Sequence, residues 1–220
     1  HESLENGSLH ILVGTHAILE DKVKFKNLGL AIIDEQHRFG VAQRAKLWYK
    51  NNFPPHVLVM TATPIPRTLA MSIYGDLDFS VIRELPPGRK KIKTFLLGEN
   101  NRLKLFKFLR EQIDLGRQIF IVYPFIEESK KMDYKDLMDG YESICREFPL
   151  PKYRISIMHG KMKTEDKDYE MKRFLQGKSQ IMVSTTVIEV GVNIANANVM
   201  VIESSERFGL SQLHQLRGRV

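Results

Sequence analysis

Short runs of apolar residues without polar alternation recur along the chain. They lie at residues 10–14, 29–33, 56–60, 117–122, 154–158, 180–184 and 198–202. Such runs are typical of strands buried on both faces, as in a parallel sheet that helices cover on both sides. Helix-like segments separate the runs, so the pattern predicts an α/β fold.

Residues 99–115 have the spacing of an amphipathic helix. The apolar stripe that we expect to face the core consists of Leu103, Phe106, Leu109 and Ile113. Gly116 follows at the position where a glycine commonly ends a helix.

A second helix is predicted at 165–176. Thr164 is a candidate N-cap, and the acidic residues that follow it suit the positive end of the helix. Its inward side chains should be Met171, Phe174 and Leu175. The mixed charge of 127–153 predicts a long surface helix with a loop.

Residues 84–91, ELPPGRKK, lie between strand-like runs at 79–82 and 92–97. Two prolines, a glycine and three basic residues are typical of a linker between domains. We therefore expect two α/β domains, residues 1–86 and 87–220. A surface loop within one domain is the alternative interpretation.

The composition agrees with an ordinary soluble globular protein, since 43% of the 220 residues are hydrophobic and 27% are charged. No apolar stretch is long enough to span a membrane and no signal peptide is visible, so we expect a cytoplasmic protein. The single cysteine, Cys145, excludes an internal disulfide framework and a cysteine-based zinc site. A net charge of +7 favours a polyanionic partner.

Polar residues stand directly after several of the predicted strands, where open parallel sheets bind their ligands. Asp34 and Glu35 follow the run 29–33, and Thr61 and Thr63 follow the run 56–60. An apolar strand that ends in Asp-Glu is the pattern by which nucleotide hydrolases support Mg²⁺ and orient the attacking water. The threonines are natural hydrogen-bonding neighbours for the residues after Glu35.

A second polar cluster lies near the end of the sequence, in and around a predicted helix. It consists of Gln212, Gln215, Arg217 and Arg219. Paired arginines beside glutamine suit a sensor of the γ-phosphate or an arginine finger. A basic helix face on the surface is the alternative interpretation.

Five segments resemble the successive motifs of superfamily 2 helicases. They are DEQHRFG at 34–40, TATPIPRT at 61–68, ELPPGRK at 84–90, TTVIEVGV at 185–192 and QLHQLRGRV at 212–220. Asp-Glu-Gln-His followed by Arg-Phe-Gly, with the later Pro-Pro-Gly-Arg-Lys, is similar to the RecG family of ATP-dependent DNA helicases. The resemblance implies two RecA-like parallel-sheet domains of the P-loop NTPase type, the first incomplete.

The resemblance also implies roles for individual residues in binding ATP and Mg²⁺. Asp34 would be the magnesium-side carboxylate and Glu35 the catalytic base, while Gln36, His37, Thr61 and Thr63 would couple the state of the nucleotide to DNA contact. From the second domain the residues near the nucleotide and its phosphates would be Gly191, Asn193, Gln215, Arg217 and Arg219. The DNA backbone would be contacted by Gly14, Thr15, His16, Thr185 and Thr186.

Some features depart from the family pattern. Position 193 is asparagine where the family has aspartate, and the phosphate-loop pattern of glycines, lysine and serine or threonine appears nowhere. We therefore expect this segment alone to hold ATP poorly and to be inactive. The family's branched-DNA wedge and its translocation segment also have no counterpart in the sequence.

The resemblance implies that the chain is part of a full-length enzyme, a monomeric motor that uses ATP to remodel branched duplex DNA, such as stalled forks and Holliday junctions. Two alternatives remain open. One is the motor of a transcription-repair coupling translocase, although His37 and the linker favour RecG. The other is a nucleic-acid-binding module that does not hydrolyse ATP, although the intact Asp34-Glu35 pair argues against it.

Overall fold

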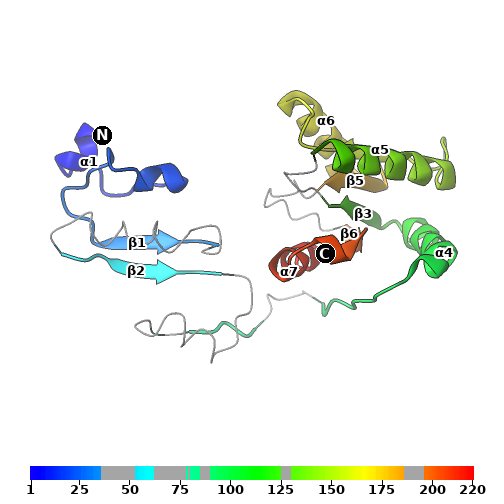
Figure 1. The fold of residues 1–220 in the computed structure, drawn as a ribbon, viewed down its shortest axis with the longest axis horizontal. Coiled ribbons are helices and arrows are strands. Elements are labelled where there is room, and N and C mark those ends of the chain that lie inside the picture. The colour runs from blue at the N-terminus through cyan, green and yellow to red at the C-terminus, as the bar shows by residue number, and fades with distance from the viewer. Residues whose placement is uncertain (36–52, 62–77, 79, 85–89, 125–129, 186–195) are drawn as a thin grey trace. The chain divides into compact units, whose positions relative to one another are not determined.

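The computed structural model describes residues 1–35, 53–61, 78, 80–84, 90–124, 130–185 and 196–220 (Figure 1). The chain divides into two compact units, His1–Phe79 (unit 1) and Ser80–Val220 (unit 2). The predicted domain boundary at 86/87 falls among residues outside the described ranges, so it stays a prediction. Within those ranges, no helix is long and apolar enough to cross a membrane.

Unit 1 is built on two parallel strands, β1 (Leu30–Ile33) and β2 (His56–Val59). They follow two short helical segments, α1 (Glu2–Glu5) and η1 (His16–Leu19). Leu19 of η1 packs against Ala31 and Ile33 in a small core. The apolar runs 29–33 and 56–60 are therefore confirmed as strands of a parallel sheet.

Two expectations for unit 1 are wrong. β1 is buried on one face only, since Ala31 and Ile33 are buried while Leu30 and Ile32 are more than half exposed. The run 10–14 is irregular, with Ile11 and Val13 largely exposed. An apolar run becomes a strand only where another strand pairs with it, and none of the described residues pairs with 10–14.

Unit 2 contains a four-stranded parallel sheet in the order β4-β5-β3-β6. The strands are β3 (Gln118–Tyr123), β4 (Ile155–Met158), β5 (Ile181–Thr185) and β6 (Ala197–Ile202). Figure 1 shows β5, β3 and β6 side by side. Every residue of β3 and β5 is buried, which confirms that these central runs are covered on both faces.

Helices cover both faces of this sheet, as the alternation of side chains along β3 demonstrates. Ile119, Ile121 and Tyr123 pack with residues of α4 (Arg102–Asp114) and α5 (Lys130–Glu147). Phe120 and Val122 point the other way, toward α6 (Thr164–Leu175) and α7 (Leu210–Arg217). The predicted α/β architecture of parallel strands between helices is thus confirmed in unit 2.

The predicted helix at 99–115 is confirmed as a short turn, η3 (Glu99–Asn101), followed by α4, but one inward residue was misassigned. Leu103 is 79% exposed, whereas Leu105 packs against the core. At about 100° per residue, Leu103 lies about 120° around the helix from the fully buried Leu109, and Leu105 only about 40°. Gly116 ends the helix as predicted, with φ +78° and an N–H donated to the Ile113 carbonyl.

The other helices bring two corrections and one confirmation. α6 begins at Thr164 itself, with Lys163 at the N-cap position, so Thr164 is not the cap. Leu175 is exposed, because it lies about 100° around the helix from the buried Phe174. The helix expected within 127–153 is confirmed as α5, a long surface helix whose apolar face, with Leu137 and Ile144, packs against the sheet.

The runs predicted as strands on either side of the linker are not strands in the described part of the chain. Residues 80–82 and 92–97 are irregular, and the apolar side chains among them are exposed. As with the run 10–14, the apolar composition alone predicted a strand, but no partner strand pairs with them there.

A buried side chain, Gln118, links the start of β3 to the end of α6. Its Nε2 donates to the main-chain carbonyls of Phe174, at 2.6 Å, and Ser179, at 2.8 Å. Ser179 is itself buried, and its hydroxyl lies 2.8 Å from that of Ser156 on β4. Buried polar groups that are paired in this way hold an element in one position.

Candidate functional site

The carboxyl ends of β1 and β2 bring the predicted catalytic pair beside one of the coupling threonines. The strands are in register, with Ile33 opposite Val59, and the Met60 N–H donates to the Ile33 carbonyl at 2.8 Å. Asp34-Glu35 and Thr61 therefore leave the same edge of the sheet. This juxtaposition follows from parallel pairing, as the sequence pattern predicts.

The main chain turns sharply at Glu35. Its φ of +50° lies in the left-handed region, which a residue with a side chain adopts at a cost. The Asp34 Oδ1 accepts the Glu35 N–H at 2.9 Å, which stabilises this turn. The turn leaves the Asp34 side chain exposed and that of Glu35 half-buried, so the two adjacent carboxylates have different surroundings.

The donors at this edge fit Mg²⁺ held partly by a nucleotide. Among the described residues no group of three or more His, Cys, Asp or Glu side chains could hold a metal by itself. Mg²⁺ is commonly bound through one or two carboxylates, with water and substrate phosphates completing the octahedron. The exposed carboxylate of Asp34 would supply the protein's share.

The predicted DNA-contact loop of unit 1, Gly14-Thr15-His16, is exposed throughout. A Cβ at position 14 would lie 2.6 Å from the Ile18 Cγ2, so a residue with a side chain here would force Ile18 to shift. The loop leads into η1, whose Leu19 packs on the strand that ends at Asp34. Its exposure is what a contact with a phosphate backbone requires.

At the carboxyl edge of the unit 2 sheet, the predicted DNA contact Thr185 is buried. Thr185 is the last residue of β5, lies opposite Tyr123 and is 1% exposed. This position does not bring its hydroxyl to the surface, where a phosphate contact needs it. The neighbouring strand β4 ends one residue before His159, on the same edge.

His159 lies among positive charges. Partial burial and the ammonium groups of Lys161 and Lys167 lower the pKa of its imidazole. The Lys167 Nζ also approaches the Gly160 carbonyl, at 3.4 Å. The lowered pKa favours a neutral imidazole near neutral pH.

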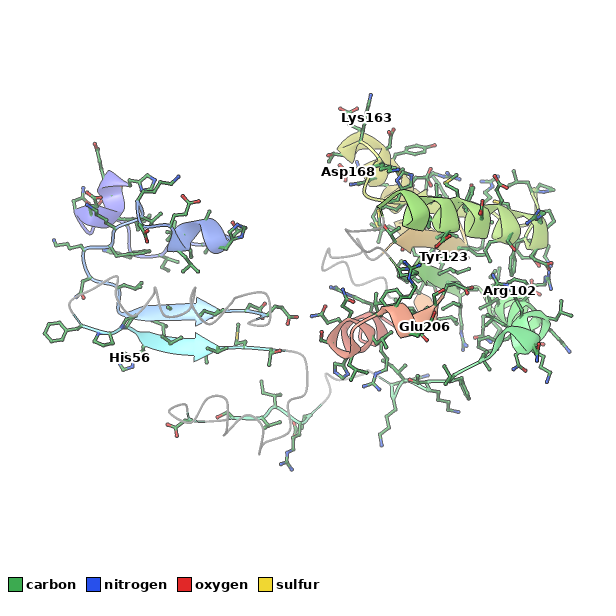
Figure 2. All side chains as sticks on the ribbon, in the orientation of Figure 1. His56, Arg102, Tyr123, Lys163, Asp168 and Glu206 are labelled. Carbon is green, nitrogen blue, oxygen red and sulfur yellow. The ribbon has the colours of Figure 1, made fainter. Side chains whose placement is uncertain are left out.

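A charged cluster that the sequence reasoning missed lies at the ends of β3 and β6. The Arg102 Nη1, at the start of α4, lies 3.2 Å from the Glu203 Oε1. Burial and the Glu203 carboxylate raise the pKa of Tyr123 to about 12, against the opposing effect of Arg102. Figure 2 shows Arg102 and Tyr123 in this part of unit 2. The only local signal was the position of Glu203, directly after an apolar run.

The predicted phosphate sensors lie on and just after α7. Leu216 is buried and anchors the helix, whereas the Arg217 side chain is exposed with its Nη2 3.3 Å from the His214 Nδ1. Arg219 follows the helix and is partly exposed. Gln215 is half-buried.

Gln212, the remaining member of the C-terminal cluster, helps to begin α7. Its Oε1 accepts the Gly209 N–H at 3.1 Å. Several predicted site residues lie outside the described ranges, and their roles stay predictions: Gln36, His37, Thr63, Thr186, Gly191 and Asn193.

Two family models match the chain. The DEAD/DEAH box helicase model matches residues 1–72 and the helicase conserved C-terminal domain model matches residues 102–220. Curated proteins named ATP-dependent DNA helicase RecG are similar along all or nearly all of the chain. Those from Synechocystis, Thermotoga maritima and Bacillus subtilis are 51%, 52% and 51% identical to it. The chain spans only 26%, 28% and 32% of their lengths.

Solved structures agree with these relatives. A structure of RecG bound to a three-way DNA junction is 46% identical, with a TM-score of 0.66, and covers the whole chain, which corresponds to 28% of that protein. A variant of the yeast protein Dbp5, bound to RNA and ADP BeF3, matches 93% of the chain and 53% of its own length at a TM-score of 0.54. At 13% identity, this second likeness concerns the fold alone.

Proposed function

The chain belongs to the RecG family of superfamily 2 helicases, and from this premise we propose that it forms the core of a motor that uses ATP to remodel branched DNA. Because the chain spans about a quarter to a third of its relatives, the activity belongs to the whole protein. The proposal therefore concerns what these residues contribute to it.

The observation that carries the proposal is the Asp34-Glu35 turn at the carboxyl edge of β1. Asp34 is exposed and would help to hold Mg²⁺ with the phosphates of ATP. Glu35 is half-buried and held by the turn, as suits a base that orients and deprotonates the attacking water. Thr61, on the same edge, would report the state of the nucleotide to the DNA-binding residues.

Unit 2 would contribute positive charge near the nucleotide, and unit 1 would contribute part of the DNA contact. We assign Arg219 to the γ-phosphate, with Arg217 as the competing candidate, because a guanidinium neutralises the charge that develops during transfer. The exposed loop Gly14-Thr15-His16 suits contact with the DNA backbone, which carries no sequence information. The RecG structure with a three-way junction supports branched duplex DNA as the substrate. We further propose a monomeric motor that acts in the cytoplasm.

The test is ATP hydrolysis by the full-length gene product, with a three-way junction and with linear duplex of equal length. The junction should stimulate phosphate release more than the duplex does. Glu35→Gln should reduce stimulated release by roughly 10²- to 10⁴-fold, the usual contribution of a positioned base. Glu5→Gln, on the exposed surface of α1, is the control and should change little. Stimulated hydrolysis that survives Glu35→Gln would refute the assignment.

A further inference from the structure

The segment that joins β6 to α7 is held by two ion pairs from helices on the opposite face of the sheet. The segment runs from Glu203 through η5 (Ser205–Arg207) to Gly209. Ser204, at φ +48° and ψ +51°, turns the chain sharply away from the strand. The direction in which α7 leaves the sheet therefore depends on how this short segment is held.

The first ion pair holds the start of the segment. The Arg102 Nη1 lies 3.2 Å from the Glu203 Oε1 and 3.3 Å from its Oε2, so one nitrogen serves both carboxylate oxygens. The guanidinium also lies over the Phe106 ring, 5.3 Å from its centroid. Since Phe106 is buried, this contact holds the Arg102 guanidinium against the core, in the position where it pairs with Glu203.

The second ion pair holds the end of η5. The Arg207 Nη1 lies 3.3 Å from the Asp136 Oδ2 on α5. The next residue, Phe208, is buried with Leu216 in the core on the α7 side of the sheet. The segment is thus held at Glu203 and Arg207 by charge and at Phe208 by packing, immediately before the helix begins.

We propose that Arg102 and Asp136 are positioning residues for α7, and that through Glu203 and Arg207 they set where the guanidinium groups at 217 and 219 lie. This inference rests on the proposed ATPase function. Neither residue needs to touch the nucleotide. A small displacement of α7 moves both arginines together, and a misplacement of about 1 Å in an active site can lower the rate about 100-fold.

The experiment compares Arg102→Gln with Arg110→Gln in the full-length protein. Arg110 is a matched control on the same helix: its Nη2 lies 2.8 Å from the Glu147 Oε2, and its guanidinium lies 5.2 Å from the Phe148 ring centroid. The side chains of Arg102 and Arg110 are 40% and 37% exposed. Arg110, however, joins α4 to α5 and does not touch the segment before α7.

We expect Arg102→Gln to lower the kcat of DNA-stimulated ATP hydrolysis roughly 10- to 100-fold, with the KM for ATP changed less than about twofold. Arg110→Gln should leave kcat within about twofold of wild type. An unchanged kcat in Arg102→Gln, an effect on KM alone, or an equal loss of kcat in Arg110→Gln would each overturn the proposal.

A charge exchange in the second ion pair tests the proposal even where a single variant folds poorly. Asp136→Arg should lower kcat by a similar factor, and the double variant Asp136→Arg/Arg207→Asp should recover to within about threefold of wild type, because the pair is restored with its charges exchanged. A double variant no better than Asp136→Arg would refute the role of this pair. If the wild-type protein shows no DNA-stimulated hydrolysis, or if Glu35→Gln leaves that hydrolysis unchanged, the proposed function itself fails, which is a different outcome.

Discussion

The left-handed main chain at Glu35 leads to a prediction about stability that is independent of catalysis. Glu35→Ala and Glu35→Gly both remove the carboxylate and differ only in the Cβ. At an ordinary position alanine is the more stable of the two by about 0.5–1 kcal/mol, because glycine has more freedom in the unfolded chain. At φ +50° the order should reverse.

The size of the reversal can be estimated from the two opposing contributions. A residue with a Cβ in the left-handed region costs about 1–2 kcal/mol, which the glycine variant avoids. The greater freedom of glycine in the unfolded chain opposes this by about 0.5–1 kcal/mol, in favour of alanine. Taking the midpoints of the two ranges, we expect Glu35→Gly to be more stable than Glu35→Ala by about 0.75 kcal/mol, and at most about 1.5 kcal/mol, with both variants equally defective in DNA-stimulated ATP hydrolysis.

Urea unfolding of the chain, followed by tryptophan fluorescence, measures this difference in unit 1. Trp48 is the only tryptophan of the sequence and belongs to that unit. Glu20, in the same unit with φ −60° and an exposed side chain, is the control. There the alanine variant should be the more stable one. If alanine is also at least as stable as glycine at position 35, the inference of backbone strain at Glu35 is refuted.

Three further predictions concern charge, a buried amide and pH. Arg219→Lys keeps the charge but loses the planar fork, so turnover in the full-length protein should fall far more than ATP affinity, and near-normal turnover would remove this residue from the active site. Gln118→Met leaves two buried carbonyls without their side-chain donor and should lower the free energy of unfolding by about 1–3 kcal/mol. Urea unfolding followed by circular dichroism measures this free energy, and an unchanged value would contradict the prediction. Because the pKa of His159 is lowered in the folded protein, the unfolded chain binds the proton more readily, and stability should be lost as pH falls below the usual pKa of about 6.5. His159→Gln should reduce the fall of the melting temperature as pH drops below about 6.5. An unchanged fall would contradict the inference that His159 causes it.

The candidate catalytic edge could be predicted from the sequence because its geometry follows from local pattern. An apolar run that ends in Asp34-Glu35 and a second run that ends before Thr61 need only pair in parallel to bring these residues to one edge. Parallel pairing is the general behaviour of such runs between helices. The same reasoning predicted β3 and β5, buried at every position.

Local pattern could not decide which apolar residues find a partner. The run 10–14 and the central strands are similar in composition, yet the run remains unpaired within the described residues while β3 gains a strand on each side. Within α4, the apolar spacing predicted Leu103 as an inward residue, whereas the position of the sheet places Leu105 against the core and leaves Leu103 exposed. Pairing and burial depend on what the rest of the chain brings alongside.

By itself, the sequence determined the α/β class, the order of most strands and helices, and the carboxylate pair at the end of β1, because each depends on neighbours a few residues away. Only the tertiary structure decided that Thr185 is buried and that Arg102 meets Glu203. That pair joins residues separated by 101 positions, and no local periodicity encodes such a contact. It exists because β3 and β6 lie side by side, which places the start of α4 next to the end of β6.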